Sequence, residues 1–147
     1  MIVDKINKLK TDFNTYDSWE DRYRHIIKIG KGLEGFDEQY QVEKYKIKGC
    51  QSQVWLKPEL VDGKMKLSAD SDSVLVKGIV GILLQVYGHE APSDILKNPP
   101  AFLGELGITE HLSMNRTNSL ASMVKQIQLY AQLFESLIEK GVLNASP

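Results

Sequence analysis

The chain has 147 residues, charged and hydrophobic fractions close to those of ordinary globular proteins, and a formal net charge of −1 at pH 7. Its length predicts a single domain over residues 1–147 with a hydrophobic core of its own. Because the net charge is close to zero, we expect neither nucleic acid nor an anionic membrane as a partner. The only cysteine, Cys50, excludes an internal disulfide and favours a reducing compartment, so we expect a cytoplasmic protein.

The apolar segments do not have the pattern of a signal peptide or a membrane span. Charged residues between Asp4 and Asp12 interrupt every apolar run near the N-terminus, unlike in a secretory signal. The most apolar stretch, residues 74–86, is broken by Lys77 and is too short to cross a bilayer.

Hydrophobic periodicity predicts two helices and then three strands in the first half of the chain. The helices are expected over 2–13 and from Ser18, as N-cap, to the glycines at 30, 32 and 35. Alternating apolar residues predict strands over 41–47, over 52–60 and around Met65 and Leu67, with a turn at Asp62-Gly63. We therefore expect a three-stranded antiparallel meander over roughly 41–70, with Cys50 connecting the first two strands.

The second half is predicted to be helical. Caps and breakers predict a helix over about 73–87, short helices from Pro92 and near 101–106, and a long final helix from about 115 to 140. The final helix carries an apolar stripe, and we expect it to pack across the sheet. Strands followed by a run of helices predict an α+β fold, with helices on one face of a small three-stranded antiparallel sheet.

Cys50 lies in the run Lys48-Gly49-Cys50-Gln51-Ser52-Gln53-Val54-Trp55, which is typical of a turn that leads into a strand. A lone cysteine is most often a small buried hydrophobic residue without chemistry. This one has a glycine and polar residues around it, whereas buried cysteines usually have apolar neighbours. The cationic Lys48 could also lower the pKa of a partly exposed thiol. The pattern therefore favours a reactive thiol.

Other chemistries have little support in the sequence. A cysteine hydrolase needs a histidine beside the thiol, and His25, His89 and His111 stand in no recognisable catalytic context. The chain lacks the ligand spacing of a metal site, the length of a P-loop and any cofactor motif. We therefore expect no bound metal and no cofactor.

Three segments together have the pattern of a known family. They are Gly49-Cys50-Gln51-Ser52-Gln53-Val54-Trp55-Leu56, Ala69-Asp70-Ser71-Asp72-Ser73 leading into Val76-Lys77-Gly78-Ile79, and Glu110-His111-Leu112-Ser113-Met114-Asn115-Arg116. In these segments the chain resembles the SufE/CsdE family, the sulfur acceptors that partner cysteine desulfurases in iron–sulfur cluster assembly. The octamer around the cysteine is the most specific of the three, and the resemblance extends over nearly the whole chain.

The resemblance implies an α+β fold like that of the iron–sulfur scaffold proteins, without a bound cofactor. It also implies that Cys50 accepts persulfide sulfur from a cysteine desulfurase, which is a pyridoxal phosphate enzyme. The acceptor stimulates that enzyme and passes the sulfur to a scaffold or another acceptor, so it is a sulfur carrier rather than a stand-alone enzyme. Contacts of the loop or the partner are expected at Gly49, Gln51, Ser52, Gln53, Asp70, Asp72 and Arg116.

Some of these residues also have ordinary structural explanations. Asp70 and Asp72 could act only as negative charge at a helix N-terminus. Arg116 is expected close to Cys50, where it would bind a partner or hold the loop. Family members often carry an acidic residue where this chain has Gly104, so the neighbouring Glu105 receives no role.

Two rival functions remain at this stage. An adaptor could activate a desulfurase without carrying sulfur, and trapping a persulfide on Cys50 would separate the two functions. A thiol-dependent hydrolase would need a histidine beside Cys50. The sequence does not distinguish the SufE from the CsdE branch, and it identifies neither the donor desulfurase nor the oligomeric state.

Overall fold

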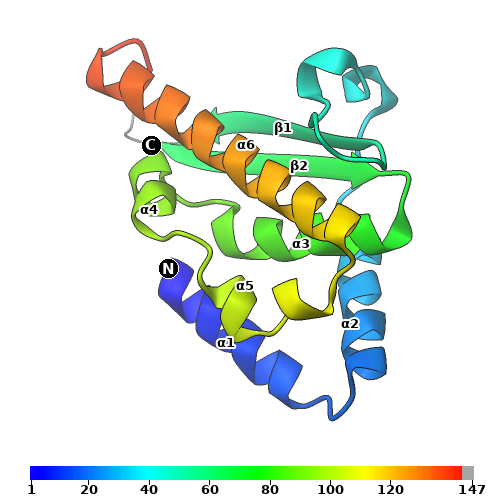
Figure 1. The fold of residues 1–147 in the computed structure, drawn as a ribbon. Helices are drawn as coiled ribbons and strands as arrows, with labels where there is room; N and C mark the ends of the chain where they lie inside the picture. The colour runs from blue at the N-terminus through cyan, green and yellow to red at the C-terminus, as the bar shows by residue number, and fades with distance from the viewer. Residues whose placement is uncertain (144–147) are drawn as a thin grey trace.

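The structure, a computed structural model, describes residues 1–143. Two helices precede a β-hairpin and four helices follow it, with short 3-10 turns between them (Figure 1). The elements are α1 (Ile2–Asn14), α2 (Trp19–Lys31), the 3-10 turns η1 (Glu38–Tyr40) and η2 (Glu43–Tyr45), β1 (Val54–Val61), β2 (Lys64–Ser71), α3 (Val74–Tyr87), α4 (Pro92–Lys97), α5 (Phe102–Glu105), the 3-10 turn η3 (Thr109–His111) and α6 (Met114–Glu139). The predicted α+β class is confirmed.

β1 and β2 form an antiparallel hairpin whose register runs from Val54 opposite Ser71 to Val61 opposite Lys64. Asp62 and Gly63 both have positive φ, 53° and 77°, as the tight hairpin turn requires. The predicted Asp62-Gly63 turn is therefore confirmed.

The expected third strand over residues 41–47 is wrong, because the described sheet has only two strands. The middle of this segment, Glu43–Tyr45, forms η2. The segment meets β1 in one bridge, Lys46 with Trp55, where the Ile47 N–H donates to the Val54 carbonyl at 2.8 Å. Backbone groups on one edge of a strand alternate, so Leu56 and Pro58 follow Val54 on this edge. Pro58 has no N–H to donate there, and a longer ladder would lose a hydrogen bond.

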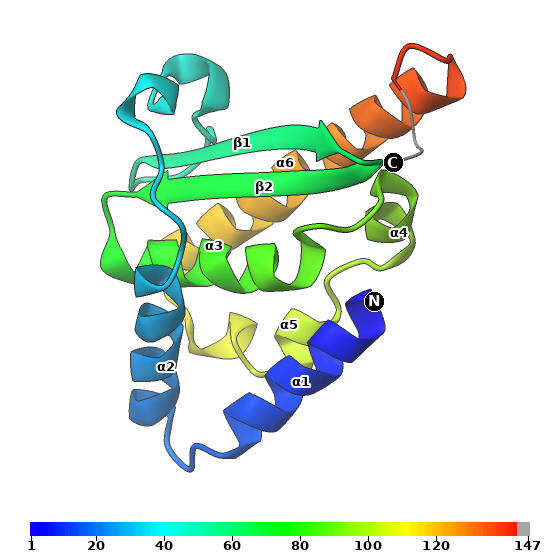
Figure 2. The same ribbon diagram turned by 180° about the vertical axis from the view of Figure 1, so that it is seen from behind.

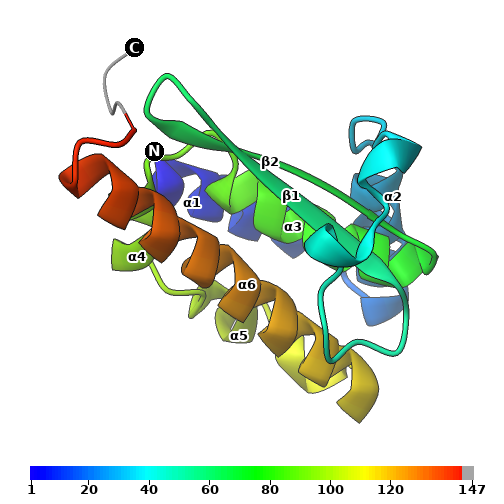
Figure 3. The same ribbon diagram turned by 90° about the horizontal axis from the view of Figure 1, so that it is seen from above.

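This correction also moves Cys50, which lies before the hairpin and not between two strands of a meander. Residues 48–53, here called the Cys50 loop, leave the Lys46–Trp55 bridge and return to β1. In the view from above, the loop reaches the first turns of α6 (Figure 3).

α3 lies against one face of the hairpin and forms the centre of the molecule, with α1 and α2 packed on its other sides (Figure 2). α2 crosses α3 at a glycine contact. A Cβ on Gly30 would lie 2.6 Å from the backbone nitrogen of Gly78, and a Cβ on Gly78 would overlap the Ile26 carbonyl. The sequence predicts that the glycines at 30, 32 and 35 end α2. Gly32 does cap the helix, which continues past Gly30 to Lys31, and Gly30 is a packing contact instead.

α6 has its main contacts with α3 and α4 rather than across the hairpin, and it runs beside the hairpin in Figure 3. Its buried residues, Leu120, Met123, Ile127 and Ala131, belong to the apolar stripe seen in the sequence and complete a core shared with the hairpin and α3. Among the described residues, no helix combines the length and apolar character needed to span a membrane.

Candidate functional site

The Cys50 loop has a backbone conformation that only glycine adopts easily at its second residue. Gly49 has φ +88°, in the left-handed region. A Cβ at this position would also lie 2.8 Å from the Ser122 Oγ on α6. Both the positive φ and the short distance to Ser122 require a glycine here. Because glycine has no Cβ, the backbone next to the cysteine can approach α6 closely.

Cys50 itself is half-buried at the edge of the core, so it is neither a fully buried hydrophobic residue nor a free surface thiol. Its Sγ donates a weak hydrogen bond to the Ser119 carbonyl at 3.9 Å. Burial raises the pKa of the thiol, and the nearby Ser119 side chain lowers it by a smaller amount. The sequence suggests that Lys48 lowers this pKa; the structure gives the opposite net direction, because desolvation dominates.

The first turns of α6 form the wall against which the loop lies. Ser113 caps the helix by accepting from the Arg116 N–H, and the Asn115 Nδ2 donates to the Gln51 Oε1 at 3.1 Å. A cavity of about 170 Å³ opens between the loop and the helix. It is lined by Gln51, Ser52, Val76, Ser113, Asn115, Arg116 and Ser119. Arg116 therefore shares a cavity with the two residues that follow Cys50, as expected from the sequence.

The two predicted aspartates hold backbone segments around the loop. Asp72 accepts from the Gln53 N–H at 2.9 Å through Oδ1, and its own N–H donates to the Gln53 carbonyl at 3.3 Å. Asp70 accepts from the Gln41 Nε2 at 2.9 Å and lies 3.3 Å from the Lys77 Nζ. Asp72 thus fixes the end of the Cys50 loop, whereas Asp70 joins the segment before the loop to α3.

The three histidines are engaged elsewhere. The Nδ1 of His25 lies 3.3 Å from the Tyr16 hydroxyl. His111 stacks on Trp19, with the two ring centroids 3.8 Å apart. His89 follows α3, and its N–H donates to the Met65 carbonyl. Within residues 1–143 no hydrogen bond joins a histidine to Cys50, and no group of three or more potential metal-ligating side chains is found. The arrangement gives no support to a Cys-His hydrolase.

Sequence reasoning named Asn115 in the family pattern but missed Ser119 and Ser122, which lie beside the loop on the same helix. Asn115, Ser119 and Ser122 are spaced four and three residues apart, so they lie on one face of the helix. That spacing was visible in the sequence as a short polar stripe beside the apolar one. What the sequence lacked was the information that Cys50 would lie against this stripe.

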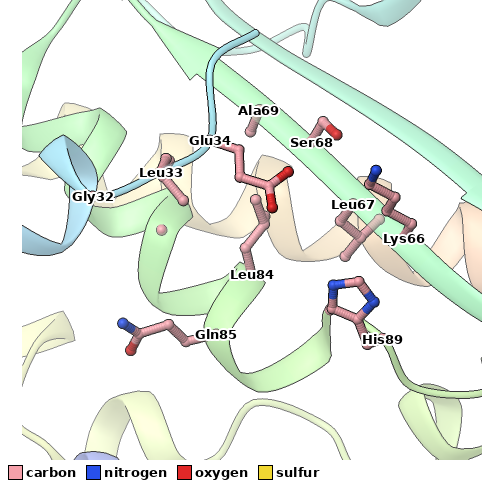
Figure 4. Close-up of a pocket in the computed structure, with 12 residues that line it drawn as sticks. Gly32, Leu33, Glu34, Lys66, Leu67, Ser68, Ala69, Leu84, Gln85 and His89 are labelled. Atoms are coloured by element: carbon pink, nitrogen blue, oxygen red, sulfur yellow. The ribbon is translucent and has the colours of Figure 1, made fainter.

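Two further features lie away from the Cys50 loop. Glu105, for which the sequence predicts no role, forms an ion pair with Lys10 of α1. A separate cavity of about 190 Å³ lies between β2, the end of α3 and the segment after α2, with Glu34, Lys66 and His89 around it (Figure 4). None of the sequence-predicted site residues lines this cavity.

Comparison with known proteins identifies the fold and the family of this chain. A solution structure of a hypothetical protein from Thermus thermophilus has the same fold, with a TM-score of 0.75 and 19% identity over 90% of this chain and 96% of that one. The family model "SufE: Fe-S metabolism associated domain" matches residues 7–131.

Curated relatives agree with the family match. SufE-like proteins of Rhizobium meliloti and Rhizobium etli are 34% and 35% identical, covering 86% and 90% of this chain and 94% and 93% of their own lengths. One of Synechocystis is 32% identical over 87% of this chain and 80% of its own length. The chain belongs to the SufE family, whose domain is associated with iron–sulfur metabolism.

Proposed function

We propose that the protein accepts sulfur as a persulfide on Cys50 from a cysteine desulfurase, stimulates that enzyme and passes the sulfur on for iron–sulfur cluster assembly. The observation that carries the proposal is the placement of Cys50. The thiol is half-buried near the tip of a short loop that is held to α6 by a few polar contacts. A carrier needs both properties, because its sulfur must reach a partner's active site and be sheltered afterwards.

The transfer step is an exchange at sulfur. The Cys50 thiolate attacks the outer sulfur of a Cys–S–SH group on the donor, a new S–S bond forms, and the donor cysteine leaves as its thiolate. One sulfur atom moves and no external oxidant or reductant is consumed. The pyridoxal phosphate that generates the donor persulfide belongs to the desulfurase. This chain is proposed to use no cofactor of its own and to work in the cytoplasm.

The residues around Cys50 receive roles from their contacts. Gly49 allows the loop to bend against α6, and Gln51 is held by Asn115. Gln53 is held by Asp72, so these two contacts restrain the part of the loop that follows the thiol. Both involve exposed groups, and water can replace each of them when the loop moves toward a donor.

The remaining predicted residues are proposed to support the loop or the partner. Ser52 and Arg116 line the cavity beside Cys50, where the positive charge of Arg116 favours an anionic persulfide or a carboxylate of the donor. Asp70 is proposed to act indirectly, because its contacts are with Gln41 and Lys77. The downstream acceptor is proposed to be an iron–sulfur scaffold or another thiol protein.

The test mixes the protein with candidate cysteine desulfurases, cysteine and pyridoxal phosphate, and reads its intact mass for one added sulfur. We expect the mass increase for the wild type and its complete loss in Cys50→Ser, because a serine hydroxyl is scarcely ionised near neutral pH and forms no persulfide. Desulfurase turnover should lose its stimulation in the same variant, while the melting temperature changes little.

Thr11→Ala, which removes an exposed hydroxyl on α1 away from the Cys50 loop, is the control and should still gain the sulfur. Full stimulation by Cys50→Ser without added mass would reject the carrier in favour of an adaptor that only activates the desulfurase. A Cys50→Ser variant that unfolds would instead make the cysteine a structural residue.

A further inference from the structure

Ser119 of α6 contacts the sulfur of Cys50 itself, rather than another part of the Cys50 loop. It is only 4% exposed, whereas its helix neighbours Asn115 and Arg116 are exposed. Its carbonyl accepts the weak hydrogen bond of the Cys50 thiol, and its hydroxyl donates to the Asn115 carbonyl at 3.1 Å. Ser119 therefore contacts the sulfur through its carbonyl, and little water can reach its buried side chain.

The present contact suits a thiol and does not suit an anion. A carbonyl oxygen can only accept a hydrogen bond, so it pairs with S–H but faces a thiolate with its negative end. Sulfur that has lost its proton needs a donor in place of this acceptor, particularly because Cys50 is half-buried.

The Ser119 hydroxyl is free to become that donor. In an α-helix the carbonyl of residue 115 accepts the backbone N–H of residue 119, so the Asn115 carbonyl keeps a partner when the hydroxyl turns away. The change needs only a rotation within the Ser119 side chain. It costs less than moving a charged side chain into the site.

We propose that Ser119 is a positioning residue for Cys50, whose hydroxyl donates to Asn115 while the sulfur is a thiol and to the sulfur when it is a thiolate or an anionic persulfide. The part of this inference that concerns the persulfide rests on the proposed function, whereas the part that concerns the thiolate does not. It assigns to α6 a role in holding the charged form of the sulfur, in addition to supporting the loop.

The electrostatic surroundings agree with this role. Burial raises the pKa of Cys50, and the nearby Ser119 side chain opposes that rise. The charged groups of the neighbouring segments are Lys48 in the loop, Arg116 on α6 and Asp72 before α3. Among the causes of the shift, Ser119 is the one that favours the thiolate.

The experiment measures the rate at which iodoacetamide alkylates Cys50 across a range of pH. A change in access alters the rate by the same factor at every pH, whereas a change in thiolate stability moves the midpoint of the profile. For Ser119→Ala we expect the midpoint to move to higher pH and the rate near neutral pH to fall severalfold, with the high-pH plateau kept. Because alanine favours helix over serine, this variant should fold normally.

Ser122→Ala is the matched control, since it makes the same chemical change one turn along α6, next to Gly49 rather than Cys50. Its midpoint should equal that of the wild type. Ser119→Thr keeps the hydroxyl and should restore the wild-type midpoint. An unchanged midpoint in Ser119→Ala, or an equal shift in Ser122→Ala, would overturn the proposal.

A second measurement addresses the persulfide. Cys50 is loaded with glutathione persulfide, and the bound sulfur is followed by intact mass; we expect its loss to be faster in Ser119→Ala than in Ser122→Ala. Equal rates would remove the persulfide part of the proposal. Neither the alkylation profile nor the loss of persulfide sulfur requires a desulfurase. Failure of the proposed function would be seen in a different experiment, as wild-type protein that gains no sulfur from any desulfurase.

Discussion

The contact between α2 and α3 and the contact between the Cys50 loop and α6 are built in opposite ways. At Gly30 and Gly78 two helix backbones touch directly, with no room for even one methyl group. At the loop, separate polar contacts join exposed or half-buried groups, such as Asn115 with Gln51. The comparison indicates a rigid scaffold that carries one segment able to detach, because packed backbones have no alternative partner whereas exposed polar groups can bind water.

The largest effect should come from filling the α2–α3 contact. Gly78→Ala places a Cβ onto the Ile26 carbonyl, which cannot move away because it belongs to a packed helix. We expect unfolding to become easier by about 3 kcal/mol, as for strong overpacking. Chemical denaturation measures this, and Gly104→Ala is the control, because a Cβ there meets nothing within 4 Å. Equal stability of the two variants would contradict the close contact.

The next effect breaks the loop contact at its narrowest point. Gly49→Ala combines a positive φ with a Cβ that meets the Ser122 Oγ, so the loop should move off α6. We expect a loss of about 1 kcal/mol in stability and faster alkylation of Cys50. Adding Ser122→Ala removes part of the overlap and should return the alkylation rate part of the way. Slower alkylation in the single variant would show that the loop does not detach.

A milder change releases only one end of the loop. Asp72→Ala removes the acceptor of the Gln53 N–H. Since both groups are exposed, stability should fall by only about 0.5–1 kcal/mol, while amide hydrogen exchange at Gln53 accelerates. Asp72→Asn keeps an oxygen in the same position and should retain most of the protection. Equal exchange in the two variants would mean that the carboxylate oxygen does not hold this N–H.

The smallest effect concerns the scaffold far from the loop and depends on pH. Burial lowers the pKa of His25 from its ordinary value of 6.5; Asp12 raises it by a smaller amount and Lys28 lowers it slightly further. The unfolded chain therefore binds a proton more readily, and stability should decrease as the pH falls below about 6.5. In His25→Gln the melting temperature should depend less on pH in this range. His89→Gln is the control, and a similar change in that variant would contradict the assignment to His25.

The α6 side of the site illustrates what local reasoning can and cannot find. Ser113 to Arg116 were recognised because they form a helix start with a family pattern, and Arg116 does line the cavity beside Gln51 and Ser52. Ser119 and Ser122 were not recognised, since a serine within a helix has no local signature of contact with a distant loop. The pKa direction of Cys50 was missed for a related reason: Lys48 is visible in the sequence, whereas burial is not.

The sequence by itself determined the features that depend on neighbouring residues. The cap at Ser18, the Asp62-Gly63 turn, the apolar stripe of α6 and the octamer around Cys50 are all local patterns, and their physical causes act within a few residues. The tertiary structure decided that residues 41–47 form no strand, that Gly30 is a packing contact and that Ser119 lies beside Cys50. Those outcomes depend on which edges and faces meet in space, because backbone pairing, close approach and desolvation are properties of two segments together and not of either one alone.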